Sequence, residues 1–294
     1  MLINFAFSHA DHEAALRLAR FLKFVPNEGT HDLLLATTEE LVPVRNEIED
    51  LIGPLFSRVH TVTTPKLRTG WPEGPNSYFH FVAKHIHSHI PCEGWYFFEA
   101  GDSVPTRPGW LDELEADYRR GMRPVMGFVH PSYRGRVDGK LVQDGNHVVG
   151  CAVYSRDLPR RIPIFDNITV ATLAFDVFLQ WYLMPLAHST RLIDHQWQTA
   201  EYKTQKDGTV VGIGVGRRPA ELVVHPVDWS AAVIHGVKDD SLLNIVRGRL
   251  AAKGIKAVKI DKKKKNVVSQ SAPTAPVVDP LAPAPFPGSK GGWK

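Results

Sequence analysis

The chain has 294 residues, of which 43% are apolar and 22% are charged, a composition typical of one large globular domain or two small ones. Its formal net charge is +4, but residues 251–294 hold nine lysines against two aspartates, which leaves residues 1–250 with 26 basic and 29 acidic side chains. This balance of −3 excludes a folded domain built as one large cationic surface for nucleic acid, although a basic segment beside the fold can still attract a polyanion.

Short apolar runs alternate with longer amphipathic runs along the first half of the chain. The pattern predicts strands at residues 2–7, 32–36, 59–64, 95–98 and 125–129. It predicts helices at residues 11–24, 39–51, 77–89 and 110–120. This β-α-β order predicts an α/β fold whose mostly parallel sheet is covered by helices on both faces. Such folds bind ligands at the carboxyl edge of the sheet, so functional residues are expected just after strands.

The composition changes near residue 260. Four consecutive lysines at 262–265 precede a stretch rich in Ser, Ala and Pro with few large apolar residues. We therefore predict one folded domain over residues 1–250 and a disordered Lys- and Pro-rich tail at 260–294. The tail is interpreted either as a solubilising extension or as an arm that binds a polyanion.

Cysteine content and apolar runs bear on the compartment. The chain has only Cys92 and Cys151, and its start lacks a basic region followed by a long apolar run, so we predict a reduced, cytoplasmic protein. The most apolar stretch, residues 168–186, is interrupted by Asp176, Gln180 and Pro185. We predict a buried helix there and no membrane partner.

The sharpest motif is Trp95-Tyr-Phe-Phe-Glu99-Ala-Gly-Asp102, in which an apolar strand runs directly into two carboxylates. Carboxylate oxygens suit a hard cation such as Mg²⁺ or Mn²⁺, which keeps positions open for the oxygens of a diphosphate. Gly101 lets the backbone approach a ligand closely. The alternative is that Asp102 or Ser103 caps the helix expected to begin near residue 108.

A second apolar run also ends in polar chemistry, at Ala231-Ala-Val-Ile-His235-Gly-Val-Lys238. The imidazole of His235 can complete a carboxylate metal site, and the ammonium of Lys238 can neutralise a phosphate leaving group. The alternative is a structural histidine at the end of a strand.

Asp176 is an acid inside the most apolar stretch of the chain. A carboxylate there is costly unless it is paired, hydrogen-bonded or functional. Two interpretations stay open for Asp176: a salt bridge with an arginine, or a role in catalysis or acceptor binding. Asp194, in Arg191-Leu-Ile-Asp194-His195, is a second candidate of this kind.

Taken in order, these segments resemble the GT-A superfamily of glycosyltransferases, and more closely the small glycosyltransferase-type proteins of tailed bacteriophages. The resemblance covers about residues 1–245. Its matching stretches are 70–79 (GWPEGPNSYF), 94–111 (GWYFFEAGDSVPTRPGWL), 125–127 (VMG), 147–154 (HVVGCAVY) and 235–238 (HGVK). The order of these stretches is more specific than any one of them.

The resemblance implies a Rossmann-like GT-A domain with a nucleotide-sugar-binding half at about 1–130 and an acceptor-binding half at 131–250. Asp102 would bind Mn²⁺ or Mg²⁺, His235 would be the late metal ligand, and Glu99 would assist or contact the donor ribose. The other implied donor-binding residues are Lys238 at the diphosphate, Phe7, Ser8 and His9 beside the nucleobase, and Asn76. The family usually places one residue between its two acids, whereas this chain has Glu-x-x-Asp, which leaves open which acid coordinates directly.

The chemistry implied is transfer of a sugar from a nucleoside diphosphate donor, most simply a UDP-sugar, to an acceptor hydroxyl. The metal and Lys238 would neutralise the departing diphosphate. An inverting enzyme also needs a base, for which Asp176 is the first candidate and Asp144 or Asp194 the replacements. The stereochemical outcome stays open.

The resemblance to phage proteins suggests a hydroxymethylated pyrimidine in phage DNA as acceptor, which would make this a DNA-modification enzyme working in the host cytoplasm. The lysine-rich tail suits such a polyanion. Glycan, lipopolysaccharide and protein acceptors stay open.

Two functions from other classes are alternatives. A nucleotidyltransferase would share the acidic metal site, but the sequence has no glycine-rich, lysine-bearing phosphate loop near its start, and its glycine-rich stretch at 212–218 comes late. A non-catalytic nucleotide- or DNA-binding protein would share the fold without the metal chemistry.

Overall fold

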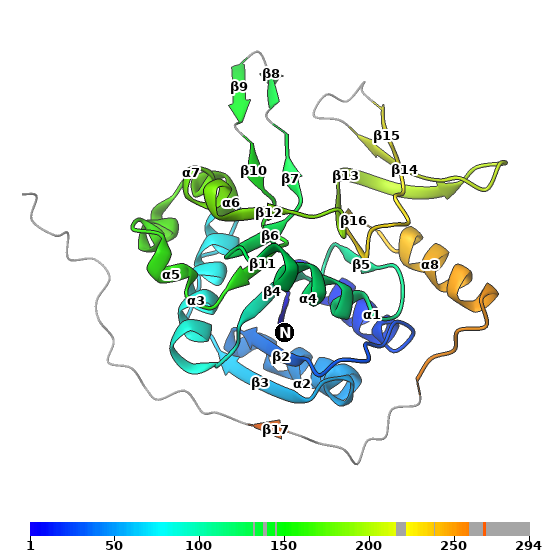
Figure 1. Cartoon of the computed structure of the whole chain (residues 1–294), viewed down its shortest axis with the longest axis horizontal. Coiled ribbons are helices and arrows are strands. Elements are labelled where there is room, and N and C mark those ends of the chain that lie inside the picture. The colour runs from blue at the N-terminus through cyan, green and yellow to red at the C-terminus, as the bar shows by residue number, and fades with distance from the viewer. Residues whose placement is uncertain are drawn as a thin grey trace, which may run out of the picture.

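The computed structural model describes residues 1–131, 133–137, 140–144, 146–215, 222–237, 239–258 and 267–268. Within these ranges the main sheet holds eight strands in the order β12-β6-β11-β4-β1-β2-β3-β17 (Figure 1). Neighbouring strands run parallel except at β11, which is antiparallel to both β4 and β6. The predicted α/β class with a mostly parallel sheet is therefore confirmed, and membership of the GT-A superfamily stays a prediction.

The first half of the chain follows the predicted alternation closely. Its parallel strands are β1 (Leu2–Ala6), β2 (Asp32–Thr37), β3 (Arg58–Thr63) and β4 (Gly94–Glu99). Its helices are α1 (His12–Leu22), α2 (Val42–Ile52), α3 (Glu73–His89) and α4 (Trp110–Gly121). Helix α1 illustrates why: Ala15, Leu18 and Leu22 recur at helical spacing and are buried, while Glu13 lies in the first turn.

Helices cover both faces of the main sheet. Ile3 and Phe5 of β1 pack in a core cluster with residues of α1, α2 and α4, whereas Leu2 and Ala6 pack in a second cluster with α3. This division follows from the alternation of side chains along a strand. In Figure 1 α3 and α5 (Leu158–Arg161) lie to the left of the sheet and α1 to the right.

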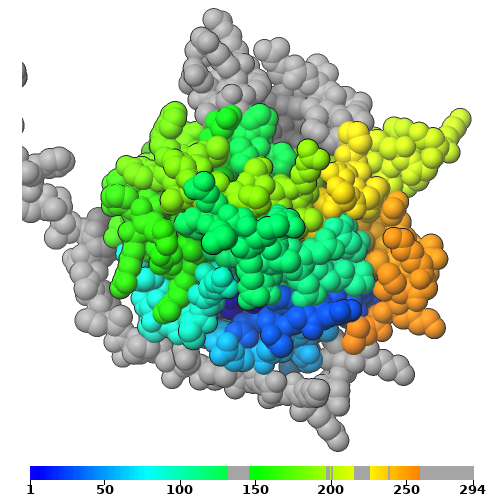
Figure 2. Space-filling model, in the orientation of Figure 1, coloured from blue at the N-terminus to red at the C-terminus, as the bar shows by residue number. Residues whose placement is uncertain are grey.

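A second sheet lies next to the carboxyl end of β4. Its strand order is β15-β14-β13-β16-β5, and β5 (Ser103–Pro105) follows β4 after a short turn. The other strands are β13 (Ile193–Thr204), β14 (Val210–Val215), β15 (Leu222–Pro226) and β16 (Val233–Val237). Helix α8 (Ser241–Ala252) contacts β13 and α1. Figure 2 shows the lime-coloured turn between β13 and β14 projecting from the body. The junction of the two sheets carries the candidate site.

The chain leaves the main sheet between β6 and β11 to form two small antiparallel pairs. These pairs are β7 (Val129–His130) with β10 (His147–Val148), and β8 (Tyr133–Val137) with β9 (Lys140–Asp144). The main-sheet strands on either side are β6 (Val125–Gly127), β11 (Val153–Ser155) and β12 (Ala187–Ser189). The strand predicted at 125–129 is thus divided at Phe128. In Figure 1 the β8–β9 hairpin extends upward from the sheet.

The predicted continuous helix at 168–186 is wrong. The segment forms four short pieces: η3 (Phe165–Val170), α6 (Phe175–Phe178), α7 (Gln180–Leu183) and η4 (Met184–Leu186). Asn76 Nδ2 donates a hydrogen bond to the carbonyl oxygen of Leu173 at 2.8 Å, which holds the chain between η3 and α6 in a non-helical form. The segment is not fully buried either, because the side chains of Val170 and Trp181 are exposed.

Among the helices that the structure describes, none combines the length and apolar character needed to cross a membrane.

The C-terminal tail was predicted over residues 260–294. Of these, only Val267–Val268 belongs to the described residues, where it forms β17 in parallel pairing with β3. The rest of the predicted tail lies outside them. The division into donor and acceptor halves near residue 130 stays a prediction.

Candidate metal centre

A tight turn brings Glu99 and Asp102 together. Strand β4 ends at Glu99, and the backbone N–H of Asp102 donates to the carbonyl oxygen of Glu99 at 3.3 Å. Residues i and i+3 of such a turn are neighbours in space, so the Glu-x-x-Asp spacing places both carboxylates on one side of the turn. Gly101 lies tightly against Asp11 of the β1–α1 loop, since a Cβ at Gly101 would stand 2.5 Å from the Asp11 carboxylate.

His235 reaches this turn from the second sheet. In β16 it lies opposite Ser103 of β5, the residue directly after Asp102. The backbone N–H groups of Gly236 and Val237 both donate to the carbonyl oxygen of Asp102 at 2.9 Å. Gly236 has a φ of +91°, which side-chain-bearing residues rarely adopt, and this explains why glycine follows the histidine. The two segments predicted separately from the sequence are thus joined by backbone hydrogen bonds.

The three side chains converge within the space of one cation. His235 Nε2 lies 3.0 Å from Glu99 Oε2 and 3.4 Å from Asp102 Oδ1. One potential ligand atom from each residue falls within 4.8 Å of the other two, and the described part of the chain holds no other such group of three or more. The side chains are 33%, 16% and 7% exposed for Glu99, Asp102 and His235, so the group opens to solvent on the Glu99 side.

Burial and mutual attraction act against each other in this group. Burial disfavours the charged form of His235, but the carboxylates of Asp102 and Glu99 outweigh it, and the pKa of His235 lies well above its ordinary value. Burial raises the pKa of Glu99, against the lowering effect of His235. The imidazole therefore carries a proton in the absence of a cation, and it then forms ion pairs with both carboxylates.

The same geometry fits a divalent cation. Metal–oxygen distances of about 2.1 Å at right angles place neighbouring ligand atoms roughly 3 Å apart, close to the two distances that His235 Nε2 makes with the carboxylates. Two carboxylates and one imidazole form a mixed donor set that suits Mn²⁺, and Mg²⁺ with a less favourable nitrogen ligand. Three protein ligands leave positions open for other oxygens.

Asp176 lies beside this group and is held by backbone amides. Its carboxylate accepts hydrogen bonds from the N–H of Gly150 and the N–H of Val177, each at 3.0 Å. A Cβ on Gly150 would stand 3.3 Å from Glu99 Oε1 and 2.8 Å from the ring of Phe175. Glycine is therefore the residue that fits between α6 and the triad formed by Glu99, Asp102 and His235. The sequence left two interpretations of Asp176 open, a salt bridge with an arginine or a role in catalysis or acceptor binding. The described hydrogen bonds of Asp176 are those with the two amides, and no arginine salt bridge is among its described contacts.

The other predicted donor-side residues occupy the same edge of the sheet but differ in exposure. Phe7 is buried against Phe5, whereas Ser8 and His9 are exposed. The Ser8 hydroxyl donates to Asp11 at 2.7 Å, which fixes the β1–α1 loop against Gly101. Asn76 is fully buried, and its amide nitrogen donates a hydrogen bond to the carbonyl oxygen of Leu173. Its Oδ1 has no hydrogen-bond partner among the described residues.

Three predicted residues are not brought to the triad by described contacts. Asp194 is paired in register with Ile234, one residue before the His195–His235 pair, so it points to the opposite face of the second sheet, where it accepts a hydrogen bond from Gln196 at 2.7 Å. The backbone of Asp144 ends β9, but its side chain lies outside the described part. Lys238 also lies outside the described residues.

His195 contacts the triad and was missed by the sequence analysis. Its Nδ1 lies 2.9 Å from Nδ1 of His235. Burial, together with the neighbouring charges of His235 and His130, lowers the pKa of His195 to about 2, so this imidazole is neutral. The sequence carried a signal, because His195 directly follows Asp194 and only one of two successive strand residues can face a given side.

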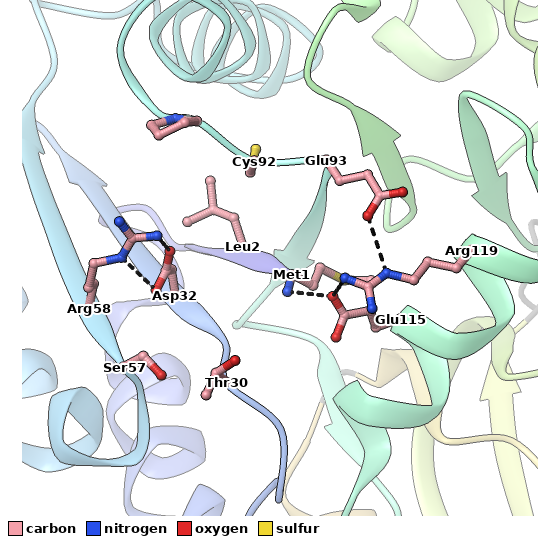
Figure 3. A pocket seen from close by; sticks show the side chains of 11 residues that line it. Met1, Leu2, Thr30, Asp32, Ser57, Arg58, Cys92, Glu93, Glu115 and Arg119 are labelled. Carbon is pink, nitrogen blue, oxygen red and sulfur yellow. Dashed lines mark hydrogen bonds and ion pairs between the residues drawn. The ribbon is translucent and has the colours of Figure 1, made fainter.

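A cavity lies at the opposite, amino edge of the main sheet (Figure 3). It has a volume of about 300 Å³ and is lined by the starts of β1, β2 and β3. Its charged groups form one pair, Asp32 with Arg58 at 2.6 Å, and one cluster. In that cluster Arg119 contacts Glu93 at 3.2 Å and Glu115 at 2.9 Å, and the Met1 ammonium contacts Glu115 at 2.8 Å. Three acids there face three cationic groups, whereas Glu99 and Asp102 face one imidazole.

Comparison with known proteins does not assign the chain to a family. No model of a protein family matches it, and no curated protein matches its sequence. The site residues themselves are therefore the basis for a functional proposal.

Proposed function

We propose that this chain is a metal-dependent glycosyltransferase that moves a sugar from a nucleoside diphosphate donor to an acceptor hydroxyl. The observation that carries the proposal is the convergence of Glu99, Asp102 and His235 at the carboxyl edge of a mostly parallel sheet. Nucleotides bind at this edge in folds of this class. An Mn²⁺ or Mg²⁺ ion there would stabilise the negative charge that develops on the departing diphosphate.

The donor would lie between the triad and the β1–α1 loop. Ser8 and His9 are exposed in this loop, and Asp11 joins it to Gly101, so nucleoside and diphosphate would be held by neighbouring segments. Glycine is the residue that fits at position 101, because the Asp11 side chain packs against the turn there. A UDP-sugar remains the proposed donor.

Asp176 is the proposed base for an inverting reaction. An ionised carboxylate has about four acceptor positions, so the two amides that hold Asp176 leave room for the proton of an acceptor hydroxyl. Because both amides are backbone groups, the carboxylate is oriented before any acceptor binds. The Asp176→Asn variant should keep donor binding and lose transfer, and transfer at the native rate would remove Asp176 from the mechanism.

Calorimetric titration with UDP and GDP, each with and without Mn²⁺, tests the proposed function. We expect one diphosphate to bind, to do so only with the metal, and to lose that binding in the Asp102→Asn variant. A nucleotide affinity that is the same with and without Mn²⁺, and the same in the Asp102→Asn variant, would favour a non-catalytic nucleotide-binding protein. The His235 ion pairs with Glu99 and Asp102 supply the observation behind that second candidate, since they satisfy the group without a metal.

The proposed acceptor is a hydroxymethylated pyrimidine in DNA, and it rests on the lysine-rich sequence at 262–265. Removal of residues 260–294 should weaken DNA binding and flatten its dependence on salt, because fewer phosphates would be neutralised. Unchanged binding and salt dependence would remove DNA as the acceptor favoured by the tail.

A further inference from the structure

Four histidine rings form a row that begins at the triad. His235 of β16 is followed by His195 of β13, His130 of β7 and His147 of β10, with successive ring centroids 4.9, 6.0 and 5.2 Å apart. The four residues come from four strands, and their proximity is not visible in the sequence. Only the first two rings are joined by a described hydrogen bond.

The two ring nitrogens of His235 face different partners. Its Nε2 faces the carboxylates of Glu99 and Asp102, and its Nδ1 lies 2.9 Å from Nδ1 of His195. The two histidines are register partners in adjacent parallel strands, so they project on the same side. The ring of Phe128, with its centroid 6.0 Å from that of His195, flanks the pair.

A hydrogen bond between two nitrogens contains one proton, and its position decides what His235 can do. If His235 Nδ1 donates, His235 Nε2 is free to direct its lone pair at a cation held by the carboxylates. If His195 donates instead, the neutral His235 ring carries its proton on Nε2, at the position that the cation needs. Ligating histidines ordinarily have their other nitrogen fixed as a donor by a neighbouring acceptor.

We propose that His195 is a positioning residue that accepts the Nδ1 proton of His235 and thereby fixes Nε2 as the metal-binding nitrogen. This inference rests on the proposed metal function of the triad. A carboxylate is the commoner acceptor in this role, but the site already holds two. A neutral imidazole orients His235 without adding a third negative charge, which keeps room for an anionic diphosphate at the same cation.

Three variants of the full chain test the proposal through the dissociation constant of Mn²⁺, measured by electron paramagnetic resonance. His195→Leu removes the acceptor and should weaken Mn²⁺ binding about 10- to 100-fold. His195→Gln restores an acceptor oxygen and should recover most of the affinity. His147→Leu, at the far end of the histidine row, should bind as the native protein does. Thermal melts without metal check that each variant is folded.

A measurement on the native protein decides the matter if His195→Leu does not fold. Long-range ¹H–¹⁵N correlation spectra with Mg²⁺ bound should show the proton of His235 on Nδ1 and that of His195 on Nε2. A proton on Nε2 of His235, or native Mn²⁺ affinity in His195→Leu, would overturn the positioning role while leaving the metal site intact. Native protein that binds no Mn²⁺ would instead overturn the proposed function, and the positioning role with it.

Discussion

The two edges of the main sheet carry charged groups in different arrangements. At the amino edge three acids face three cationic groups: Asp32 contacts Arg58, and Glu93 and Glu115 contact Arg119 and the Met1 ammonium. At the carboxyl edge two acids, Glu99 and Asp102, turn toward the same imidazole. The amino edge has a cavity of about 300 Å³ and the cavity beside Asp102 only about 20 Å³, yet the charges of the amino edge are balanced in place.

This difference is the reason for placing the proposed site at the carboxyl edge. Exposed ion pairs contribute little to stability and need no ligand to balance them. Two carboxylates on one turn repel each other, and they are held together here by backbone hydrogen bonds to Asp102 and by His235. The size of a cavity is therefore a poorer guide to the site than the way in which its charged groups are balanced.

The largest expected contrast comes from removing one acid at each edge. Glu99→Gln should weaken Mn²⁺ binding by more than the about 10- to 100-fold that the loss of an outer-shell partner costs, because it removes one of the two carboxylates of the proposed site. Glu93→Gln should leave Mn²⁺ binding unchanged, because Glu93 is an exposed partner of Arg119 at the far edge. Calorimetric titration of both variants measures the contrast, and equal losses would show that the triad does not hold the metal.

The second prediction concerns pH. The pKa of His235 is raised because, although burial opposes its charge, Asp102 and Glu99 favour it, so a cation must displace a proton from Nε2. Mn²⁺ affinity should therefore rise by up to about tenfold per pH unit until the pH passes the pKa of His235. Titrations at several pH values check this slope, and affinity that does not change with pH would contradict it.

The stability of the metal-free protein should change in the opposite direction. The folded pKa of His235 lies above its unfolded value of about 6.5, so its contribution to stability is complete below about pH 6.5. That contribution is lost as the pH rises through the folded pKa. Denaturant unfolding of the native chain and of His235→Gln, compared over this range, isolates the effect, which the variant should lack.

The third prediction uses two glycines. Gly150→Ala should cost about 1–3 kcal/mol in the free energy of unfolding and displace Asp176, because the new methyl group meets Phe175 at 2.8 Å. Gly248→Ala, in α8 with open space around its Cβ, should instead raise stability by about 0.5–1 kcal/mol. Chemical denaturation of both variants gives the two signs, and a stabilised Gly150→Ala protein would show that this packing is not close.

The smallest expected effect is at the amino edge. A double-mutant cycle on Asp32 and Arg58 should give a coupling energy of at most about 1 kcal/mol, because the arginine side chain is half exposed. Neither substitution should alter Mn²⁺ binding. A coupling of several kcal/mol would mean that the balanced charges of the amino edge contribute far more than exposed pairs do.

The sequence was a good guide wherever short-range pattern decides structure. The strand predicted at residues 95–98, which ends at Glu99, and the helix α1 follow from apolar patterning and helical periodicity. The partnership with His235, more than 130 residues away, was expected from the chemistry of its imidazole and from the family resemblance, and it agrees with the observed contacts.

Long-range packing decided the features that sequence reasoning missed. The segment at 168–186 is apolar enough for a helix, but the hydrogen bond from Asn76 to Leu173 holds part of it in another form. His195 was passed over for its neighbour Asp194, because alternation shows that the two face opposite sides without showing which side is the site. Only the register between β13 and β16 settles that choice.

The most direct test of the metal centre is crystallography of the protein grown with Mn²⁺, with data collected for anomalous scattering at the manganese edge. We expect one peak about 2.0–2.4 Å from a carboxylate oxygen of Glu99, one of Asp102 and Nε2 of His235. The absence of a peak there, or a peak only in the cavity beside Asp32 and Arg58, would contradict it.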